Sequence, residues 1–437
     1  MKVVLLDSKA LTKTQSIILI AIIVIAAVGG GAAYVLLSGD NQSSDTIKVG
    51  FLADLDMVGK DYWREIVLAG EQINAEGGIL GRQVKVIGED CMSGQNFDSN
   101  EISAALTRLL TFHEVDFVIG AVDGEGLFVS QDIVAQHEKI YIGIIGTYDE
   151  LTQRVLDDYD KYKYYFSCSW NATSVYQGMT NDLLHCRELT GFNKVGYLAE
   201  DLGIFQEAVK GLDNFVPENG FDLVYKGVCP PSTVDFSSYF AAAESAGVEI
   251  LVPLIAAQGV PFVKEYYDRQ SPMIVYGGLL VGAGYPDSWV LLDGKCEYMA
   301  VGALPSVAGY PLTSKTLPFR EAYFNRWNEI ADGGGSAYDV LRYILADAIE
   351  RAGTTETNAV IEALEETSIE TTGARNFVFT ESHALMMGKN PNDPDADYSL
   401  MMIFQWQNGE MVPVFPKKIM AEAGATYTFP DWSGPWD

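Results

Sequence analysis

The sequence predicts an α/β protein with two lobes, each built on a parallel sheet with helices on both faces. Short apolar stretches alternate with amphipathic helical stretches, and this alternation stops and then restarts farther along the chain. Such alternation is typical of parallel sheets covered by helices. The chain has 437 residues, 48% of them hydrophobic, which is enough to fill two separate cores. Ligands of such sheets bind beyond the carboxyl ends of the strands.

The first series contains, in order, the elements that one lobe needs. We expect strands over residues 47–53, 83–89, 117–120 and 140–145, and helices over 61–74, 98–112 and 127–137. The second series has strands over 194–199, 222–226, 250–254 and 273–276, and helices over 205–216, 239–246 and 260–269. A last part has helices over 318–328, 338–352 and 357–366 and strands over 400–405 and 411–416. This last part must pack back onto one or both lobes.

The formal charge of the chain is −30, from 59 acidic and 29 basic side chains. So acidic a surface repels phosphate, which argues against nucleic-acid binding and against docking of the folded part on anionic lipids. A solvated acidic surface suits either a salty or an extracytoplasmic setting, and composition does not separate the two.

The N-terminus differs from the rest of the chain. Three lysines within the first thirteen residues precede an uncharged run over 16–37, which reaches roughly 33 Å as a helix and is long enough to cross a bilayer. Acidic residues follow the run, so the positive-inside rule places the N-terminus in the cytoplasm. We expect residues 1–38 to form a cytoplasmic tip and single-pass transmembrane anchor in the cell membrane, and 39–46 a linker. A cleaved signal peptide is the alternative, and the length of the run favours the anchor; both interpretations place the rest outside the cytoplasm.

Cysteine and histidine positions indicate neither a metal site nor an enzyme. The five cysteines form no CxxC or Cys/His cluster, so no zinc site is expected, and in an exported chain one or two disulfides would form with an open pairing. The four histidines share no spacing, and no GxSxG, HExxH or Walker sequence occurs. We therefore expect no catalytic residues and no cofactor.

Several motifs resemble those of one family. IKVGFLAD at 47–54, followed by INAEGGILGRQVKVIGEDC at 73–91, is similar to the opening of Leu/Ile/Val-binding proteins, the solute-binding proteins of branched-chain amino-acid ABC transporters. The similarity continues, in the family's order, through VDFVIGAV, ELTQR, KVGYLAEDLG and MMIFQWQNGEM at 115–122, 150–154, 194–203 and 401–411. It covers nearly the whole chain after the N-terminal segment. It implies the type I periplasmic-binding fold, whose lobes are joined by three crossovers.

The resemblance also implies boundaries and partners. Crossovers are expected near Phe166, Ala303 and Phe377, so that lobe one is 47–165 and 304–376, and lobe two is 166–303 and 377–437. The implied function is extracytoplasmic binding of a small amino-acid-like or amide solute and its delivery to the permease and ATPase subunits of an ABC importer. The alternative is the ligand-sensing ectodomain of a receptor complex with the same fold.

By the same resemblance, the ligand's carboxylate meets the loops after the third and fourth strands of lobe one. These loops contain Asp123, Gly124, Glu125 and Gly126, and Gly146 and Thr147. Small residues let backbone N–H groups approach a carboxylate, and helix N-termini carry favourable partial charge. The glycines fit an ordinary turn equally, and Thr147 fits a helix N-cap as well as a ligand donor.

Lobe two departs from the family pattern. The family's tyrosine in the first loop falls on Ile204, beside Phe205, and the carboxylate that pairs with the ligand's ammonium falls near Leu279. A buried ammonium without a partner is costly. Either Asp123, Glu125 or Asp201 replaces that acid, or the ligand is not an ordinary α-amino acid. Just beyond the first crossover, Trp170 either lines the ligand site or packs under the hinge.

Overall fold

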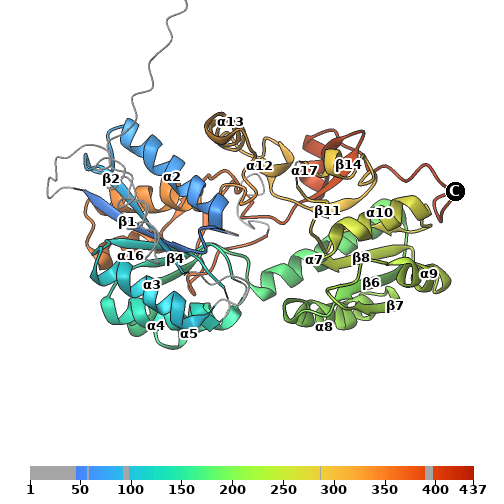
Figure 1. Cartoon of the computed structure of the whole chain (residues 1–437), viewed down its shortest axis with the longest axis horizontal. Coiled ribbons are helices and arrows are strands. Elements are labelled where there is room, and N and C mark those ends of the chain that lie inside the picture. The colour runs from blue at the N-terminus through green and yellow to red at the C-terminus, as the bar shows by residue number, and fades with distance from the viewer. Residues whose placement is uncertain are drawn as a thin grey trace, which may run out of the picture.

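A computed structural model describes residues 46–56, 59–91, 98–123, 125–146, 148–285, 287–388 and 397–437. Within these ranges, none of the helices combines the length and the apolar character that a bilayer crossing requires. The expected anchor at 1–38 and all but the last residue of the linker at 39–46 lie outside the described residues, as do Gly124 and Thr147. Figure 1 shows two α/β lobes side by side, and the prediction of this fold class is confirmed.

Lobe one is built on a parallel sheet with the strand order β2-β1-β3-β4-β5. Its strands are β1 (Ile47–Ala53), β2 (Val84–Asp90), β3 (Phe117–Ala121), β4 (Tyr141–Gly143) and β5 (Tyr165–Ser167). The helices between them are α2 (Gly59–Ala75), α3 (Ser99–Thr111), α4 (Glu125–His137), α5 (Asp149–Asp157) and α6 (Tyr159–Tyr162). Ala53 pairs with both Asp90 and Ala121, so three strands end level with one another at the carboxyl edge.

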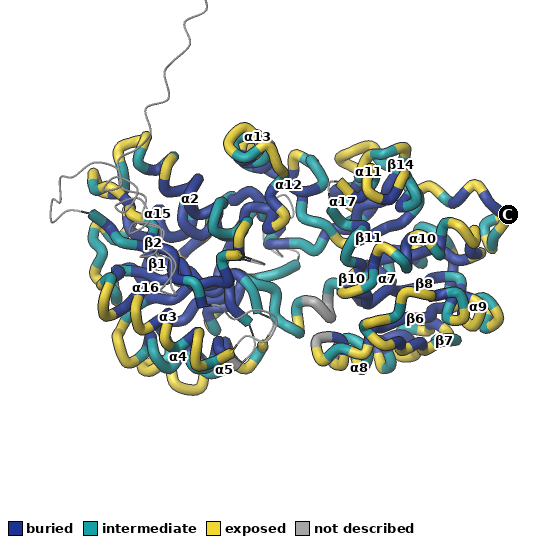
Figure 2. Tube along the Cα trace, in the orientation of Figure 1, coloured by how far each residue is buried: buried dark blue, intermediate teal, exposed yellow. Residues whose placement is uncertain are grey.

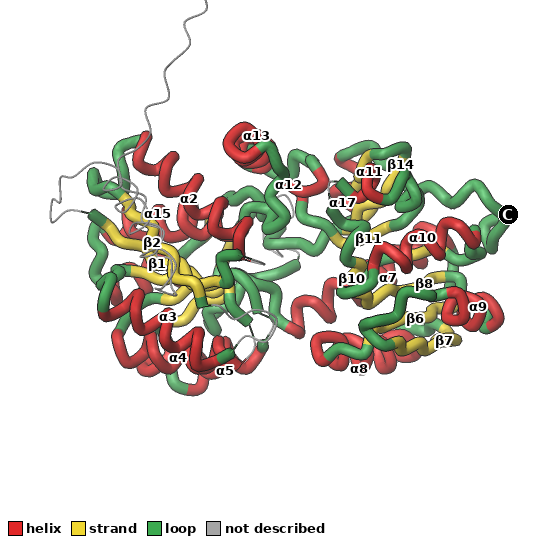
Figure 3. The backbone as a smooth tube through the Cα atoms, in the orientation of Figure 1, coloured by secondary structure: helices red, strands yellow, loops and turns green. Residues whose placement is uncertain are grey.

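The strands of this sheet are largely buried (Figure 2), and helices lie on both sides of it (Figure 3). Successive residues of a strand point to opposite faces, so Phe51 packs in one core and Leu52 in the other. The core around Leu52 is closed by α3 and α4. The core around Phe51 is closed by α2 and by the returning C-terminal part, which contains α14 (Ser336–Asp339), η1 (Val340–Leu345), α15 (Ala346–Ala352) and α16 (Thr357–Glu365).

A buried carboxyl group joins α2 to this returning segment. Glu65 is 0% exposed, and its two oxygens accept the backbone N–H groups of Gly335 (2.9 Å) and Ala337 (3.0 Å) at the start of α14. Burial raises the pKa of Glu65 from 4.5 to about 8, although the two backbone N–H groups act in the opposite direction. Asp339, at the end of α14, is also buried, and burial raises its pKa to about 6.

Lobe two repeats the plan with the strand order β10-β8-β6-β7, and β9 also pairs with β8. Its strands are β6 (Lys194–Glu200), β7 (Asp222–Cys229), β8 (Ile250–Ile255), β9 (Ile274–Val275) and β10 (Leu279–Leu280). Its helices are α7 (Ala172–Thr190), α8 (Gly203–Glu218), α9 (Ser237–Ser245), α10 (Gly259–Arg269) and α11 (Ser288–Leu291). Tyr197 and Leu198 point into the two cores on opposite faces of the sheet.

Smaller elements complete the chain. An antiparallel sheet on lobe two contains β11 (Ala300–Gly302), β14 (Ile403–Gln407) and β15 (Glu410–Phe415), followed by α17 (Lys417–Glu422). The remaining elements are α12 (Pro305–Ala308), α13 (Thr316–Trp327), β12 (Ser368–Ile369) and β13 (Phe377–Val378). The chain first leaves lobe one after β5. Tyr310 and Leu312, just after α12, still pack against Phe404 of the antiparallel sheet, whereas Phe319 of α13 packs in the core of lobe one.

The third passage between the lobes differs from the expectation. Phe377, Phe379 and Leu385 are buried in the core of lobe one, and the rings of His383 and Phe166 stack 4.0 Å apart. The backbone N–H of Ser167 donates to the carbonyl of His383 (2.9 Å). The boundary expected at Phe377 is therefore too early in the chain, because these long-range aromatic contacts keep the segment in lobe one.

The disulfide expectation is also corrected, since the five cysteines, all within the described residues, are free thiols. Four of them, Cys91, Cys186, Cys229 and Cys296, are buried, and they act as small apolar side chains in three different cores.

Candidate functional site

The carboxyl edges of the two sheets meet at the junction of the lobes. Asp149 begins α5 after β4 of lobe one, and its carboxylate accepts the hydroxyl (2.8 Å) and backbone N–H (3.2 Å) of Thr173 at the start of α7. Farther along the junction, burial raises the pKa of Tyr62 in the first turns of α2, and Tyr285, which follows β10 of lobe two, is among the groups that raise it further. Loops beyond the strand ends of both lobes therefore form the junction.

Three of the predicted residues of lobe one lie around the ends of β3 and β4. Gly146 has φ +104°, and a Cβ there would lie 2.5 Å from Leu127 Cδ1 and 3.5 Å from Asp123 Oδ1. Gly146 is thus required where the loop after β4 crosses the loop after β3. Gly126 is buried, and any side chain there would clash with Ile102 of α3. Close packing of α4 on α3 explains Gly126 without a ligand.

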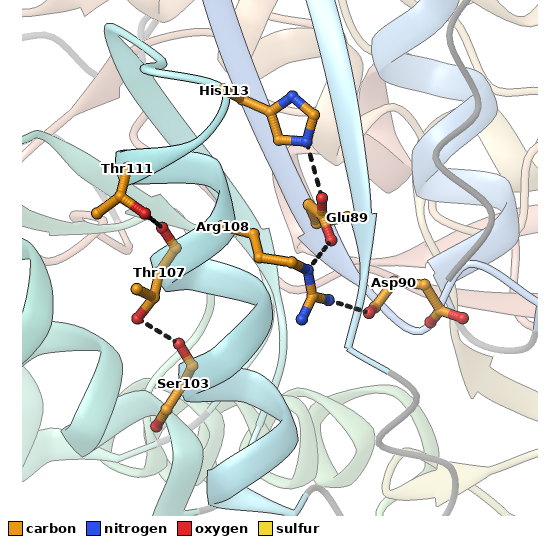
Figure 4. Close-up of polar contacts among 7 residues, drawn as sticks. All are labelled: Glu89, Asp90, Ser103, Thr107, Arg108, Thr111 and His113. Atoms are coloured by element: carbon orange, nitrogen blue, oxygen red, sulfur yellow. Dashed lines mark hydrogen bonds and ion pairs between the residues drawn. The ribbon is translucent and has the colours of Figure 1, made fainter. Parts of the chain in front are cut away.

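The carboxyl end of β2 is fixed by an ionic cluster (Figure 4). Glu89 is 8% exposed, and it accepts Arg108 Nε at 2.7 Å and lies 2.9 Å from His113 Nε2. The neighbouring Asp90 accepts the backbone N–H of Leu55, in the loop after β1, at 3.4 Å. Because these contacts join β2, α3 and the loop after β1, the acidic pair at the end of β2 stabilises this edge of the sheet.

In lobe two, the acid that organises the edge is Glu200, which the sequence analysis missed. Glu200 ends β6, is 1% exposed, and accepts three consecutive backbone N–H groups, those of Ala256 (2.9 Å), Ala257 (2.7 Å) and Gln258 (2.8 Å). These N–H groups precede α10, where the helix dipole favours a negative charge. The only sequence signal was an acidic residue ending an otherwise apolar strand.

The other predicted residues of lobe two have different surroundings. Asp201 is exposed, and its backbone N–H donates a hydrogen bond to the backbone carbonyl of Cys229 (2.8 Å). Phe205 is only 4% exposed and packs in the lobe two core, so burial inside the lobe explains it. Leu279 is 45% exposed at the sheet edge, directly after a turn through Gly277 and Gly278 with positive φ.

Glu125 begins α4 and Ile204 lies in the first turn of α8, and the side chains of both lie outside the described part of the structure. Trp170 is half-buried and packs against the lobe one core, which favours packing under the hinge.

Acidic side chains from both lobes also lie near one another at the junction, and no sequence pattern predicts this. Asp332 of lobe one precedes Gly333, where a Cβ would lie 2.5 Å from the Tyr62 ring. Burial, together with the carboxylates of Asp61 and of Asp287 from lobe two, raises the pKa of Asp332 to about 6. Within the described ranges, Asp332 forms no ion pair, but the ammonium group of Lys60 acts to lower its pKa and Arg64 pairs with Asp61 at 3.5 Å, so basic groups partly balance these carboxylates.

Cavities of about 280 and 460 Å³ lie away from these edges, the first beside α2, η1 and α15 and the second against β15. Neither is lined by a residue predicted to bind the ligand. Among the described residues, no group of three or more His, Cys, Asp or Glu side chains could hold a metal ion.

Two parallel α/β lobes, joined by crossing segments and meeting at their strand ends, define the type I periplasmic-binding class of proteins. The chain belongs to the periplasmic binding protein family, whose model matches residues 46–410.

Individual relatives agree with this assignment. Leu/Ile/Val-binding protein homolog 7 of Brucella melitensis is 23% identical over 402 residues, covering 87% of this chain and 94% of that protein. Homolog 8 from the same organism is 22% identical over 380 residues, covering 83% and 88%.

Solved structures share the fold. A putative branched-chain amino acid ABC transporter protein of Silicibacter pomeroyi has a TM-score of 0.76 at 18% identity, covering 89% of this chain and all of that one. A branched-chain amino acid transporter substrate-binding protein of Streptococcus pneumoniae, in complex with isoleucine, has a TM-score of 0.63 at 18% identity, covering 84% and 99%. A solute-binding protein of Rhodopseudomonas palustris, in complex with 3,4-dihydroxybenzoic acid, has a TM-score of 0.63 at 16% identity, covering 83% and 98%.

Proposed function

We propose that this protein binds a small amino-acid-like or amide solute outside the cytoplasm and delivers it to the permease and ATPase subunits of an ABC importer. The observation that carries the proposal is the meeting of the two strand-end edges at the junction between the lobes. Such an arrangement can enclose a solute by hinge motion, as two-domain binding proteins do. Membership of the periplasmic binding protein family and the branched-chain amino-acid names of its relatives support it.

The chemistry of the edges bears on the class of solute. Lobe one offers Gly146 and the loop at Asp123, where a carboxylate or carbonyl oxygen of the solute would bind. Lobe two offers an exposed Leu279 where the family's acid falls, and of the three acids predicted as replacements Asp201 is the one that belongs to lobe two. Relatives of this fold hold isoleucine in one case and 3,4-dihydroxybenzoic acid in another, so both zwitterions and plain acids are chemically reasonable candidates.

We expect leucine and valine to stabilise the wild-type protein less than short amides or apolar carboxylates do. A hydrogen bond to a charged group contributes about 1.5–3 kcal/mol, so loss of the acid at Leu279 weakens ammonium binding roughly ten- to a hundred-fold. Leu279→Glu should then shift preference toward leucine. A thermal-shift panel measures this, because a ligand raises the melting temperature by mass action.

Val290→Glu is the matched control for that panel, because Val290 is 79% exposed on α11 and gains the same charge. Tight leucine binding by the wild type that is abolished by Asp201→Asn would contradict the ligand preference and would identify Asp201 as the replacement acid.

The N-terminal segment completes the proposal: residues 1–38 would hold the binding domain at the outer face of the cell membrane. Intact-mass measurement of protein from the membrane fraction should then find residues 1–37 still attached. A mature chain that starts near Ala32 would instead favour a cleaved signal peptide and would contradict the anchor.

A further inference from the structure

The first and the third segments that pass from lobe one to lobe two start side by side. The first begins where β5 ends, at Ser167, whose backbone N–H donates to the carbonyl of His383 (2.9 Å). Ser167 also forms a parallel bridge with Ala384. The N–H of the next residue, Cys168, donates to the carbonyl of Gly143 in β4 (2.8 Å). The turn that contains His383 therefore lies against the last strand of the lobe one sheet.

The backbone of His383 has an uncommon conformation. Its φ is +59°, in the left-handed region that residues other than glycine seldom adopt. His383 ends a tight turn, in which its N–H donates to the carbonyl of Thr380 (2.9 Å). A conformation of this kind persists where the surrounding contacts enforce it. A turn alone would be satisfied by glycine or asparagine, so the side chain of His383 needs a separate explanation.

The imidazole ring connects the turn to three elements of lobe one. It is 1% exposed and stacks on Phe166 of β5 with the two ring planes 4° apart. Nδ1 lies 3.1 Å from the carbonyl oxygen of Tyr165, and because that oxygen can only accept, Nδ1 carries the proton. Nε2 lies 3.0 Å from Oε1 of Glu365, at the end of α16. The hydroxyl of Tyr159 in α6 donates to the same oxygen (2.6 Å).

We propose that His383 holds the third crossing segment against the first, so that the two segments form one hinge unit and the lobes bend beyond it. The turn cannot leave lobe one without breaking the contacts of His383 with both β5 and α16. In the third segment, the N–H of Met386 still donates to the carbonyl of Val378 in lobe one (2.9 Å). Bending of the chain therefore falls after Cys168 in the first segment and after Met386 in the third. This inference requires no assumption about the solute.

Hydrogen exchange of the full-length chain, followed by mass spectrometry without added solute, tests the proposal. His383→Phe keeps an aromatic ring but removes both nitrogen atoms. Peptides that cover residues 165–168 and 377–386 should then exchange roughly ten- to a hundred-fold faster, by a similar factor in each, because they open together.

Glu365→Ala is a milder variant, which keeps the test decisive if His383→Phe fails to fold. The side chain of Glu365 is 33% exposed, and its removal leaves the Nδ1 contact and the ring stack in place. The same two peptides should exchange faster together, by a smaller factor than in His383→Phe.

His185→Phe is the matched control. His185 is also buried, at 6% exposure, and its Nε2 lies 2.9 Å from the carbonyl of Val414, but it belongs to α7 of lobe two. This variant should speed exchange around β15 and leave both test peptides at their wild-type rates.

Three results would overturn the proposal. Faster exchange of 377–386 with 165–168 at its wild-type rate would show that the two segments open independently. Equal acceleration throughout lobe one, including β1 and β3, or equal acceleration of the test peptides in His185→Phe, would indicate general destabilisation. Wild-type rates in both His383→Phe and Glu365→Ala would show that the ring does not hold the segments together.

Discussion

Glu65→Gln should make the free energy of unfolding of the ligand-free protein fall less steeply between about pH 5 and pH 8. The pKa of Glu65 is raised by burial from 4.5 to about 8, so the folded protein holds this proton more tightly than the unfolded chain does. The contribution of the bound Glu65 proton to the free energy of unfolding is complete below about pH 4.5 and is lost as the pH rises through about 8. A shift of this size corresponds to on the order of 5 kcal/mol in the free energy of unfolding.

Urea unfolding at several pH values between 5 and 8 measures this effect. The glutamine variant should be less stable than the wild type at pH 5, because its amide N–H faces a backbone N–H of Gly335 or Ala337 in place of an acceptor. Its stability should nevertheless fall less steeply with pH than that of the wild type. The slope that remains should come from Asp182 on α7, whose pKa burial raises well above its usual value, and from Asp332 and Asp339, whose pKa values are raised to about 6.

Glu71→Gln is the control for this experiment. Glu71 lies on the same helix, its side chain is 44% exposed, and it pairs with Arg326 at 3.4 Å. The same chemical change at that position should leave the pH dependence as it is in the wild type. A wild-type free energy of unfolding that stays constant from pH 5 to 8 would show that Glu65 does not bind its proton as described.

Glu200→Ala should cost roughly 3–5 kcal/mol of stability and should also weaken solute binding. The substitution leaves the backbone N–H groups of Ala256, Ala257 and Gln258 without their shared acceptor at a buried site. These N–H groups belong to the loop after β8, which lies at the edge proposed to contact the solute. Without Glu200 the geometry of this loop should relax, and solute binding should weaken. Chemical unfolding measures the first effect, and calorimetric titration with the best solute from the thermal-shift panel measures the second.

Glu249→Ala separates the two effects. Glu249 makes a similar interaction at the opposite end of the same sheet, where its carboxylate accepts the backbone N–H groups of Asn193 (2.8 Å) and Lys194 (2.9 Å). This variant should lose stability and keep its affinity for the solute. An equal loss of affinity in both variants would indicate a general effect of destabilisation and not a role for the edge near Glu200.

The two-lobed fold was predictable because it depends on local patterns. Strands such as β3 and β8 are wholly buried apolar runs, and helices such as α2, α3 and α8 show regular amphipathic spacing. The third passage between the lobes was misplaced because it depends on Phe377 and His383 packing against a strand more than two hundred residues earlier. No local period encodes such a contact.

The candidate site was less predictable for a similar reason. The resemblance pointed to Asp123 and Gly146, which the structure does bring together. It did not point to Glu200, whose role depends on three N–H groups from another loop, or to Asp332, which meets charges from both lobes. It also selected Phe205, whose buried position depends on how α8 packs.

The central claim, that the protein encloses one small solute between its lobes, is tested most directly by native mass spectrometry of protein purified without denaturation. The spectrum should show the chain with one small-molecule adduct, which is released unchanged on denaturation, lost in Glu200→Ala and retained in Glu249→Ala. A bare chain in every preparation, with no adduct after incubation with leucine, short amides or apolar carboxylates, would contradict the claim.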